Sequence, residues 1–136
     1  MLTRGHTLNT GVRSDGDLDA SVYPDVSRLL LITDMLITDY SSIAGDYLLL
    51  NRPIILYHAD RCAYESDDRS LLFDPEASPY RVAHNPQELT EIACNFGDAA
   101  QNCRELAAFY GVRETGRASQ IVAERIAEWI GVKKNG

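Results

Sequence analysis

The chain has few positive charges for its size. It contains 13 Lys and Arg residues against 20 Asp and Glu residues, which gives a formal net charge of -7 and a sequence pI of about 4.8. The field of such a chain repels polyanions. We therefore expect no nucleic-acid partner and no attraction to an anionic lipid surface. Any anion that binds must be captured by a local arrangement of donors.

Paired cysteines and metal-binding motifs are also lacking. The three cysteines, Cys62, Cys94 and Cys103, are odd in number and do not have the CxxC spacing of zinc or dithiol sites, so free thiols are expected. No HExxH motif or carboxylate-histidine cluster suggests a metal site, and the acidic residues mostly fall where solvated loops or helix faces are expected. The sequence therefore predicts no bound metal.

Apolar runs of membrane-spanning length are missing, and the N-terminus has no basic region followed by an apolar stretch. We expect a cytoplasmic chain without direct membrane insertion. Any association with the inner face of the cell membrane would be peripheral and would use partners or further segments.

The chain is long enough for one substantial core, with 136 residues of which 45% are hydrophobic. From residue 25 onward helix and strand patterns alternate, which is typical of a parallel sheet with right-handed crossovers. We expect the α/β fold class, as a Rossmann-like three-layer domain with a short parallel sheet and a helical C-terminus. The expected parts of the single domain 1–136 are a partial strand and mobile loop (1–24), an α/β core (25–84) and C-terminal helices (85–136).

The individual elements follow from apolar periodicity and from the positions of Gly, Pro and capping residues. Asp25 is the expected N-cap of the first helix, and Pro53 is expected to stop the second. The expected helices cover residues 26–33, 42–50, 60–64, 87–96, 98–110 and 117–130. The expected strands cover residues 35–38, 54–57 and 80–83, after a strand tail in residues 1–4.

Residues 35–43, which read MLITDYSSI, are the most informative segment. Thr38 and Asp39 end a short apolar strand, and Ser41 and Ser42 precede an apolar-periodic helix. The free N–H groups and positive dipole end of such a helix make a phosphate site at the carboxyl end of a parallel strand. Ser, Thr and Asp are also common N-caps, which any strand-to-helix turn needs. Taken alone, the segment fits capping better than binding.

The order of the surrounding motifs is more specific. Over residues 23–64, an aspartate-led helix precedes LITDYSS, and a second helix and the strand NRPIILY follow it. This run resembles the CDP-glycerol glycerophosphotransferase family, the teichoic-acid and capsule polymerases. Arg4-Gly-His6 is similar to the family's R-x-H-P motif, and residues 116–119 are similar to its dGkAS motif. The resemblance therefore extends over nearly the whole chain.

The resemblance implies half of a GT-B fold, namely its C-terminal nucleotide-binding domain, without the acceptor-side domain. It also implies that the protein moves glycerol phosphate from CDP-glycerol to a polymer hydroxyl, with release of CMP, in teichoic acid or capsule biosynthesis. CDP-glycerol is the donor substrate, and no separate cofactor is expected. The implied partners are CDP-glycerol or CDP, an N-terminal GT-B half and a teichoic acid or capsule acceptor.

The resemblance also implies site residues. His6 is the catalytic candidate, because an imidazole near the donor phosphates could donate to the leaving phosphate or assist proton transfer. Ser41 and Ser42 are expected to contact the donor pyrophosphate. With the resemblance, the segment at residues 35–43 therefore fits ligand binding better than capping alone. Thr38 and Asp39 are expected to shape the turn and to reach the donor. The further substrate-binding candidates are Arg4, Arg69 and Ser119.

Three other polar residues have more than one interpretation. Arg52 is either a phosphate-neutralising group or a solvated surface arginine. Ser119 either binds the donor or belongs to a capped C-terminal helix. His58 follows the strand at 54–57 and is expected at the rim of the pocket, although the family pattern requires no histidine there.

Two other protein classes fit the sequence poorly. In a receiver domain Asp39 would accept a phosphoryl group, but the first strand is followed by Arg4-Gly-His6 and not by the acidic pair that this chemistry requires. In a serine hydrolase the nucleophile needs small neighbours, whereas Tyr40 and Ile43 flank the two serines. The remaining alternative is a nucleotide-binding or interaction module, left by truncation, that binds the donor without catalysing transfer.

Overall fold

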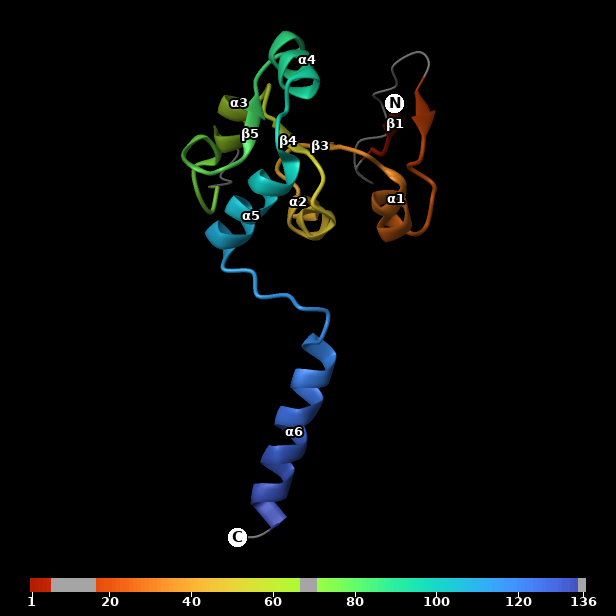
Figure 1. The fold of residues 1–136 in the computed structure, drawn as a ribbon. Coiled ribbons are helices and arrows are strands. Elements are labelled where there is room, and N and C mark those ends of the chain that lie inside the picture. Colours follow the sequence, from red (N-terminus) through yellow and green to blue (C-terminus); the bar gives the residue numbers. More distant parts are fainter. Residues whose placement is uncertain (6–16, 67–70, 135–136) are drawn as a thin grey trace.

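The computed structural model describes residues 1–5, 17–66 and 71–134. Within these residues the strands form two parallel sheets (Figure 1). In the smaller sheet β1 (Leu2–Thr3) pairs with β2 (Leu18–Asp19). The larger sheet has the order β3-β4-β5 and consists of β3 (Leu36–Thr38), β4 (Ile54–Tyr57) and β5 (Arg81–Ala83). The α/β class with parallel pairing is confirmed.

Helices connect the strands and continue to the C-terminus, as the alternating pattern predicts. The α-helices are α1 (Val26–Ile32), α2 (Ile43–Tyr47), α3 (Arg61–Ser66), α4 (Pro86–Cys94), α5 (Ala99–Tyr110) and α6 (Ala118–Lys134). Two 3₁₀ segments, η1 (Leu48–Leu50) and η2 (Pro75–Ala77), lie between them.

Polar side chains begin several of these helices. At the start of α1 the Asp25 carboxylate accepts a hydrogen bond from the Arg28 N–H at 3.2 Å, so the predicted N-cap is confirmed. Asp98 accepts from the Gln101 N–H at 2.9 Å at the start of α5. Asn85 caps α4 in the same way.

β4 is the central strand of the larger sheet, and its apolar side chains are buried on both faces. Ile54 and Leu56 pack in one cluster with residues of α2, η1 and α5. Ile55 packs in a second cluster with Ala83 and Phe96, against α4. A short continuous apolar run is typical of a parallel strand that is covered on both sides. The sheet is therefore the middle layer of three.

The helix predicted over residues 42–50 divides into α2 and η1. It ends at Asn51, whose φ of 53° lies in the left-handed region. Pro53 follows before β4, so the predicted stop is confirmed.

Residues 1–24 differ from the prediction of a single strand tail and a loop. Leu18 and Asp19 form β2, which pairs in register with Leu2 and Thr3. Two-residue strands carry no periodicity, so the sequence pattern could not indicate this pairing. Residues 6–16 of the predicted loop lie outside the described residues.

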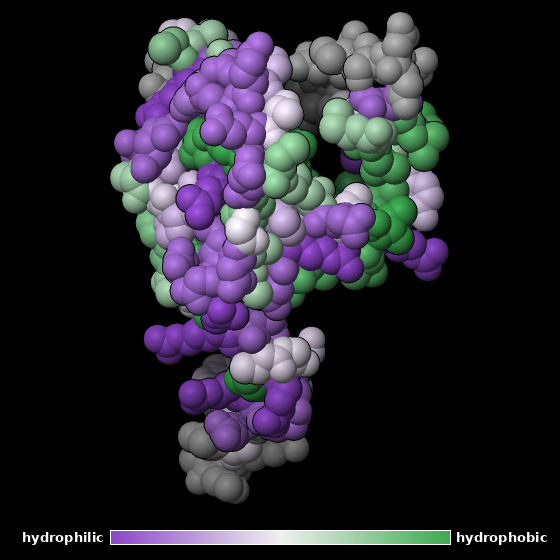
Figure 2. Space-filling view, turned by 45° about the horizontal axis from the view of Figure 1, so that its top comes forward, coloured by the Kyte–Doolittle hydropathy of each residue, from purple (hydrophilic) through white to green (hydrophobic). Residues whose placement is uncertain are grey.

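Many of the exposed hydrophobic side chains gather on two parts of the chain. Over β2 and α1 they gather at one side of the space-filling view (Figure 2), and they include Leu18, Val22, Leu31 and Ile32. On α6, which extends away from both sheets (Figure 1), they are Ile121, Val122, Ile126, Trp129 and Ile130.

Candidate functional site

The parallel pairing brings the carboxyl ends of β3, β4 and β5 to one edge of the larger sheet. Thr38 lies opposite Leu56, the last residue but one of β4. Residues 39–42 then turn the chain into α2. This is the strand-to-helix turn that the sequence predicts, and carboxyl edges of parallel sheets are where such folds bind ligands.

The two serines of the turn have different local roles. The Ser41 hydroxyl accepts a long hydrogen bond of 3.4 Å from the Ile43 N–H. Ser42 has helical backbone angles, φ -63° and ψ -10°, and its side chain makes no capping hydrogen bond to α2. Both serines are exposed. Capping therefore accounts for Ser41 only weakly and does not account for the Ser42 hydroxyl.

Tyr40 anchors the same turn to its surroundings. Its ring stacks on the ring of His58 and on that of Tyr64, and its hydroxyl donates to the Asp60 carboxylate at 3.2 Å. Burial, followed by the nearby Asp60 charge, raises the pKa of Tyr40 to about 12, so the hydroxyl stays a donor at neutral pH.

His58 lies directly after β4 and is 2% exposed. Burial lowers the pKa of His58 below its ordinary value, against a smaller opposing effect of the nearby Asp39 backbone. The ring is therefore neutral at physiological pH. The prediction that His58 lies at this edge is consistent with the structure, but the side chain is buried beneath the turn and is not at an open rim.

Charged side chains form a cluster at the same edge. Arg61 of α3 forms an ion pair of 3.1 Å with Asp74 and lies 4.0 Å from Glu76. Glu76 also lies 2.9 Å from the His84 ring, whose other nitrogen lies 3.3 Å from the His58 carbonyl oxygen. The cluster ties α3, η2 and the ends of β4 and β5 together. The sequence pattern indicated no role for His84, because its ring contacts residues of other elements.

Arg52 contacts the end of α1 in the structure. Its guanidinium donates to the Leu31 and Thr33 carbonyl oxygens at the C-terminal end of α1. A cation at this end of a helix is favourable for the exposed carbonyls and for the helix dipole. These contacts describe Arg52 more closely than a solvated surface arginine, and its role in neutralising phosphates stays a prediction.

Of the remaining predicted site residues, only Arg4 and Ser119 are described, and both lie away from the turn. The Arg4 guanidinium donates to the Ala20 and Tyr23 carbonyl oxygens and holds the segment after β2. Ser119 is exposed in the first turn of α6, away from the larger sheet (Figure 1). His6 and Arg69 lie outside the described residues. Their roles stay predictions.

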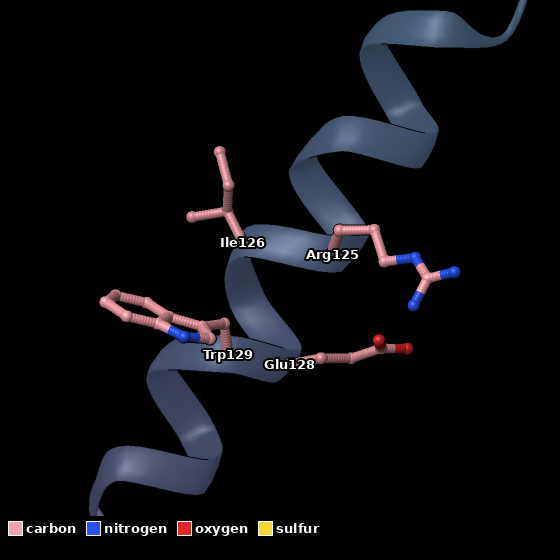
Figure 3. Close-up of a pocket in the computed structure, with 4 residues that line it drawn as sticks. All are labelled: Arg125, Ile126, Glu128 and Trp129. Atoms are coloured by element: carbon pink, nitrogen blue, oxygen red, sulfur yellow. The ribbon is translucent and has the colours of Figure 1, made fainter.

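One surface hollow lies on α6 and is lined by Arg125, Ile126, Glu128 and Trp129. Figure 3 shows the two apolar side chains on one side of the helix and the two charged ones on the other. All four come from a single helix, so the hollow has no second wall and does not form an enclosed site.

The described residues contain neither a metal-binding cluster nor a membrane-spanning helix. No group of three or more His, Cys, Asp or Glu side chains is placed to hold a metal ion in this part of the chain. None of its helices has both the length and the apolar character needed to span a bilayer.

One family model matches nearly the whole chain. Residues 3–128 match the model of CDP-glycerol:poly(glycerophosphate) glycerophosphotransferase. The chain belongs to this family. Members resemble the chain along most of its length, from the N-terminal strand into α6, as the sequence motifs predict.

Curated relatives agree with this assignment. The chain is 35% identical over 114 residues to the teichoic acid poly(glycerol phosphate) polymerase of Staphylococcus epidermidis, covering 80% of this chain and 16% of that protein. It is 32% identical over 113 residues to the teichoic acid glycerol-phosphate transferase of Staphylococcus aureus, covering 79% of this chain and 29% of that protein. The chain thus spans less than a third of the length of either relative.

The wall teichoic acid polymerase TagF has a similar structure. A variant of TagF soaked with CDPG superimposes with a TM-score of 0.70 and 30% identity, over 99% of this chain and 36% of that one. The glycosyltransferase fold of the GT-B type that the resemblance implied is therefore confirmed for the region described, and the family acts in teichoic acid biosynthesis.

Proposed function

We propose that the chain is the donor-binding part of a CDP-glycerol:poly(glycerophosphate) glycerophosphotransferase. It binds CDP-glycerol so that glycerol phosphate can pass to a polymer hydroxyl with release of CMP. The observation that carries the proposal is the exposed turn at the carboxyl edge of β3, where the Ser42 hydroxyl is not used by α2.

The reaction explains why hydroxyl and amide donors are needed at this turn. The acceptor hydroxyl gives up its proton to a base or to water as its oxygen attacks the β-phosphorus, the bond from this phosphorus to the bridging oxygen breaks, and CMP leaves with the electron pair. Negative charge grows on the bridging and terminal oxygens, so donors aimed at them lower the barrier. With a net charge of -7 the chain attracts no anion at long range, and local donors must supply the binding.

Within this proposal the site residues have separate roles. Ser41 and Ser42 contact the pyrophosphate, while Thr38 and Asp39 shape the turn. Arg4, Arg69 and Ser119 bind further parts of the donor. His6 donates to the leaving phosphate or takes part in proton transfer. The roles of Arg4, Arg69, Ser119 and His6 rest on the family motifs.

Transfer also requires an acceptor side. The chain corresponds to 36% of the matched TagF chain, and in the GT-B fold two domains close around donor and acceptor. We therefore expect residues 1–136 alone to bind CDP-glycerol and to transfer little glycerol phosphate. The alternative, a module that binds nucleotide without catalysis, is favoured by the same short coverage.

A fusion experiment distinguishes the enzyme hypothesis from the binding-module hypothesis. The chain is joined to the N-terminal half of a TagF-type polymerase, and transfer of labelled glycerol phosphate from CDP-glycerol is measured. Restored transfer supports the enzyme, and His6→Ala should then lower turnover more than donor affinity. A fusion that binds CDP-glycerol without transfer favours the module, and full activity of His6→Ala would remove its catalytic role.

CDP-ribitol is the competing donor. The teichoic acid poly(ribitol-phosphate) polymerase of Bacillus spizizenii is 46% identical over 55 residues, covering 40% of this chain and 8% of that protein. Titrations with both nucleotides compare the two donors directly. Tighter binding of CDP-ribitol would change the donor in the proposal while leaving the pyrophosphate site in place.

A further inference from the structure

The ring of Tyr40 is held between two other rings. The His58 ring stacks on it with a centroid distance of 4.3 Å and an interplanar angle of 15°. The Tyr64 ring stacks on it at 3.7 Å and 14°. Two rings so near and so parallel to a third would overlap if they shared one face. They therefore cover opposite faces of Tyr40.

The three rings come from three different elements. Tyr40 belongs to the turn after β3, His58 follows β4, and Tyr64 lies in α3. The Tyr40 hydroxyl also donates to Asp60, which limits rotation and sliding of its ring. Because Tyr40 precedes Ser41 directly, the stack restrains the backbone that carries the serine hydroxyls.

His58 is the least expected member of the stack. It is 2% exposed, and neither of its ring nitrogens has a hydrogen-bond partner among the described residues. Buried polar atoms without partners cost free energy, and an apolar ring would stack without that cost. Beside the effect of the nearby Asp39 backbone on its pKa, the described contact of the imidazole with the turn is the face-to-face stack on Tyr40. The family motifs give His58 no role.

We propose that His58 is a positioning residue, which stacks on Tyr40 and so holds residues 39–42 in the conformation that receives the donor pyrophosphate. The proposal rests on the proposed function, because it assumes that this turn binds the donor. Preorganised donors bind more tightly because less conformational freedom is lost when the ligand arrives. His58 thus acts on donor affinity without contacting the donor.

The test compares four forms of the full chain by calorimetric titration with CDP-glycerol. His58→Leu keeps a side chain of similar size but removes the flat ring, and His58→Phe keeps a ring without nitrogens. Phe109→Leu is the matched control, because its ring contacts Phe73 and Tyr110 and not the turn. We expect His58→Leu to weaken binding by at least about fivefold, and the other two variants to stay within about twofold of the wild type.

A second measurement needs no ligand. Amide hydrogen exchange at Ala44 and Gly45, whose N–H groups donate to the Ser41 and Ser42 carbonyl oxygens, should be faster in His58→Leu than in the wild type and unchanged in His58→Phe, because the ring restrains the turn. If His58→Leu does not fold, Tyr64→Leu removes the ring on the other face and carries the same expectations.

Several results would overturn the proposal. Wild-type affinity and exchange in His58→Leu would show that the stack does not position the turn, and equal weakening in His58→Phe would show that the nitrogens act and not the ring. If the wild type itself binds no CDP-glycerol, the proposed function fails and the positioning of a donor fails with it. Binding by the wild type with an unaffected His58→Leu overturns the positioning role alone.

Discussion

Replacing Ser42 by alanine separates capping from ligand binding. The Ser42 backbone is already helical, and its side chain makes no capping hydrogen bond, so alanine can take its place without losing a contact to α2. We expect Ser42→Ala to change the free energy of unfolding by less than about 0.5 kcal/mol. Loss of a working N-cap costs about 1 kcal/mol. Asp98, which accepts from the Gln101 N–H at 2.9 Å, provides that comparison in the same chain.

Thermal unfolding with and without CDP-glycerol measures both effects. For a domain of this size 1 kcal/mol corresponds to roughly 3–5 °C in Tm, so Asp98→Ala should melt earlier by about that amount and Ser42→Ala by about 1 °C or less. Added CDP-glycerol should raise the Tm of wild type and Asp98→Ala more than that of Ser42→Ala. Ser27→Ala, which removes an exposed serine from α1, is the control.

A large loss of stability in Ser42→Ala, with an unchanged response to CDP-glycerol, would refute the assignment of Ser42 to ligand binding. If Ser42→Ala lost as much stability as Asp98→Ala and kept the full response to CDP-glycerol, Ser42 would be a cap and not a ligand-binding residue. The plain capping interpretation of the sequence would then be the better one.

Three further predictions concern the parts that support the site. Arg52→Ala should lower the free energy of unfolding by about 1–2 kcal/mol in urea titrations, because it removes the charged donor from the Leu31 and Thr33 carbonyls, and an unchanged midpoint would contradict this. Wild type should lose more stability than His58→Phe between pH 7 and pH 5. Since burial lowers the pKa of His58 in the folded chain, the unfolded chain binds the extra proton first, and stability falls as pH drops below about 6.5; equal losses would show that His58 does not contribute. Leu106→Ala should cost about 2–5 kcal/mol, since Leu106 is 0% exposed in the cluster between the sheet and α5, and a cost below about 1 kcal/mol would contradict that packing.

Local sequence signals were enough to predict the helices and strands around the turn between β3 and α2. Asp25 marked the start of α1, and an apolar run of the right length marked β4. The division of the second helix was not foreseen, because the left-handed residue Asn51 and the 3₁₀ geometry before it depend on how the chain turns back toward the sheet. β2 was missed because its partner Leu2 is 16 positions away from Leu18 and two residues show no pattern.

The sequence predicted the position of the turn between β3 and α2, but not the contacts that hold this turn. The strand-to-helix turn with Ser41 and Ser42 follows from residue types alone. The stack of Tyr40 with His58 and Tyr64 joins residues that are up to 24 positions apart in the sequence, so it exists only once β3, β4 and α3 are packed. The hydrogen bonds from Arg52 to the end of α1 also join residues that are far apart in the sequence, so the sequence pattern could not predict them.

The central claim is that the turn between β3 and α2 receives the pyrophosphate of CDP-glycerol. The most direct test is an NMR titration of the ¹⁵N-labelled chain with CDP-glycerol, read at the amides of residues 38–44. We expect shifts that saturate at these amides, while amides of α6 beyond residue 124 stay unmoved. Unmoved signals over residues 38–44 at millimolar CDP-glycerol would contradict the claim.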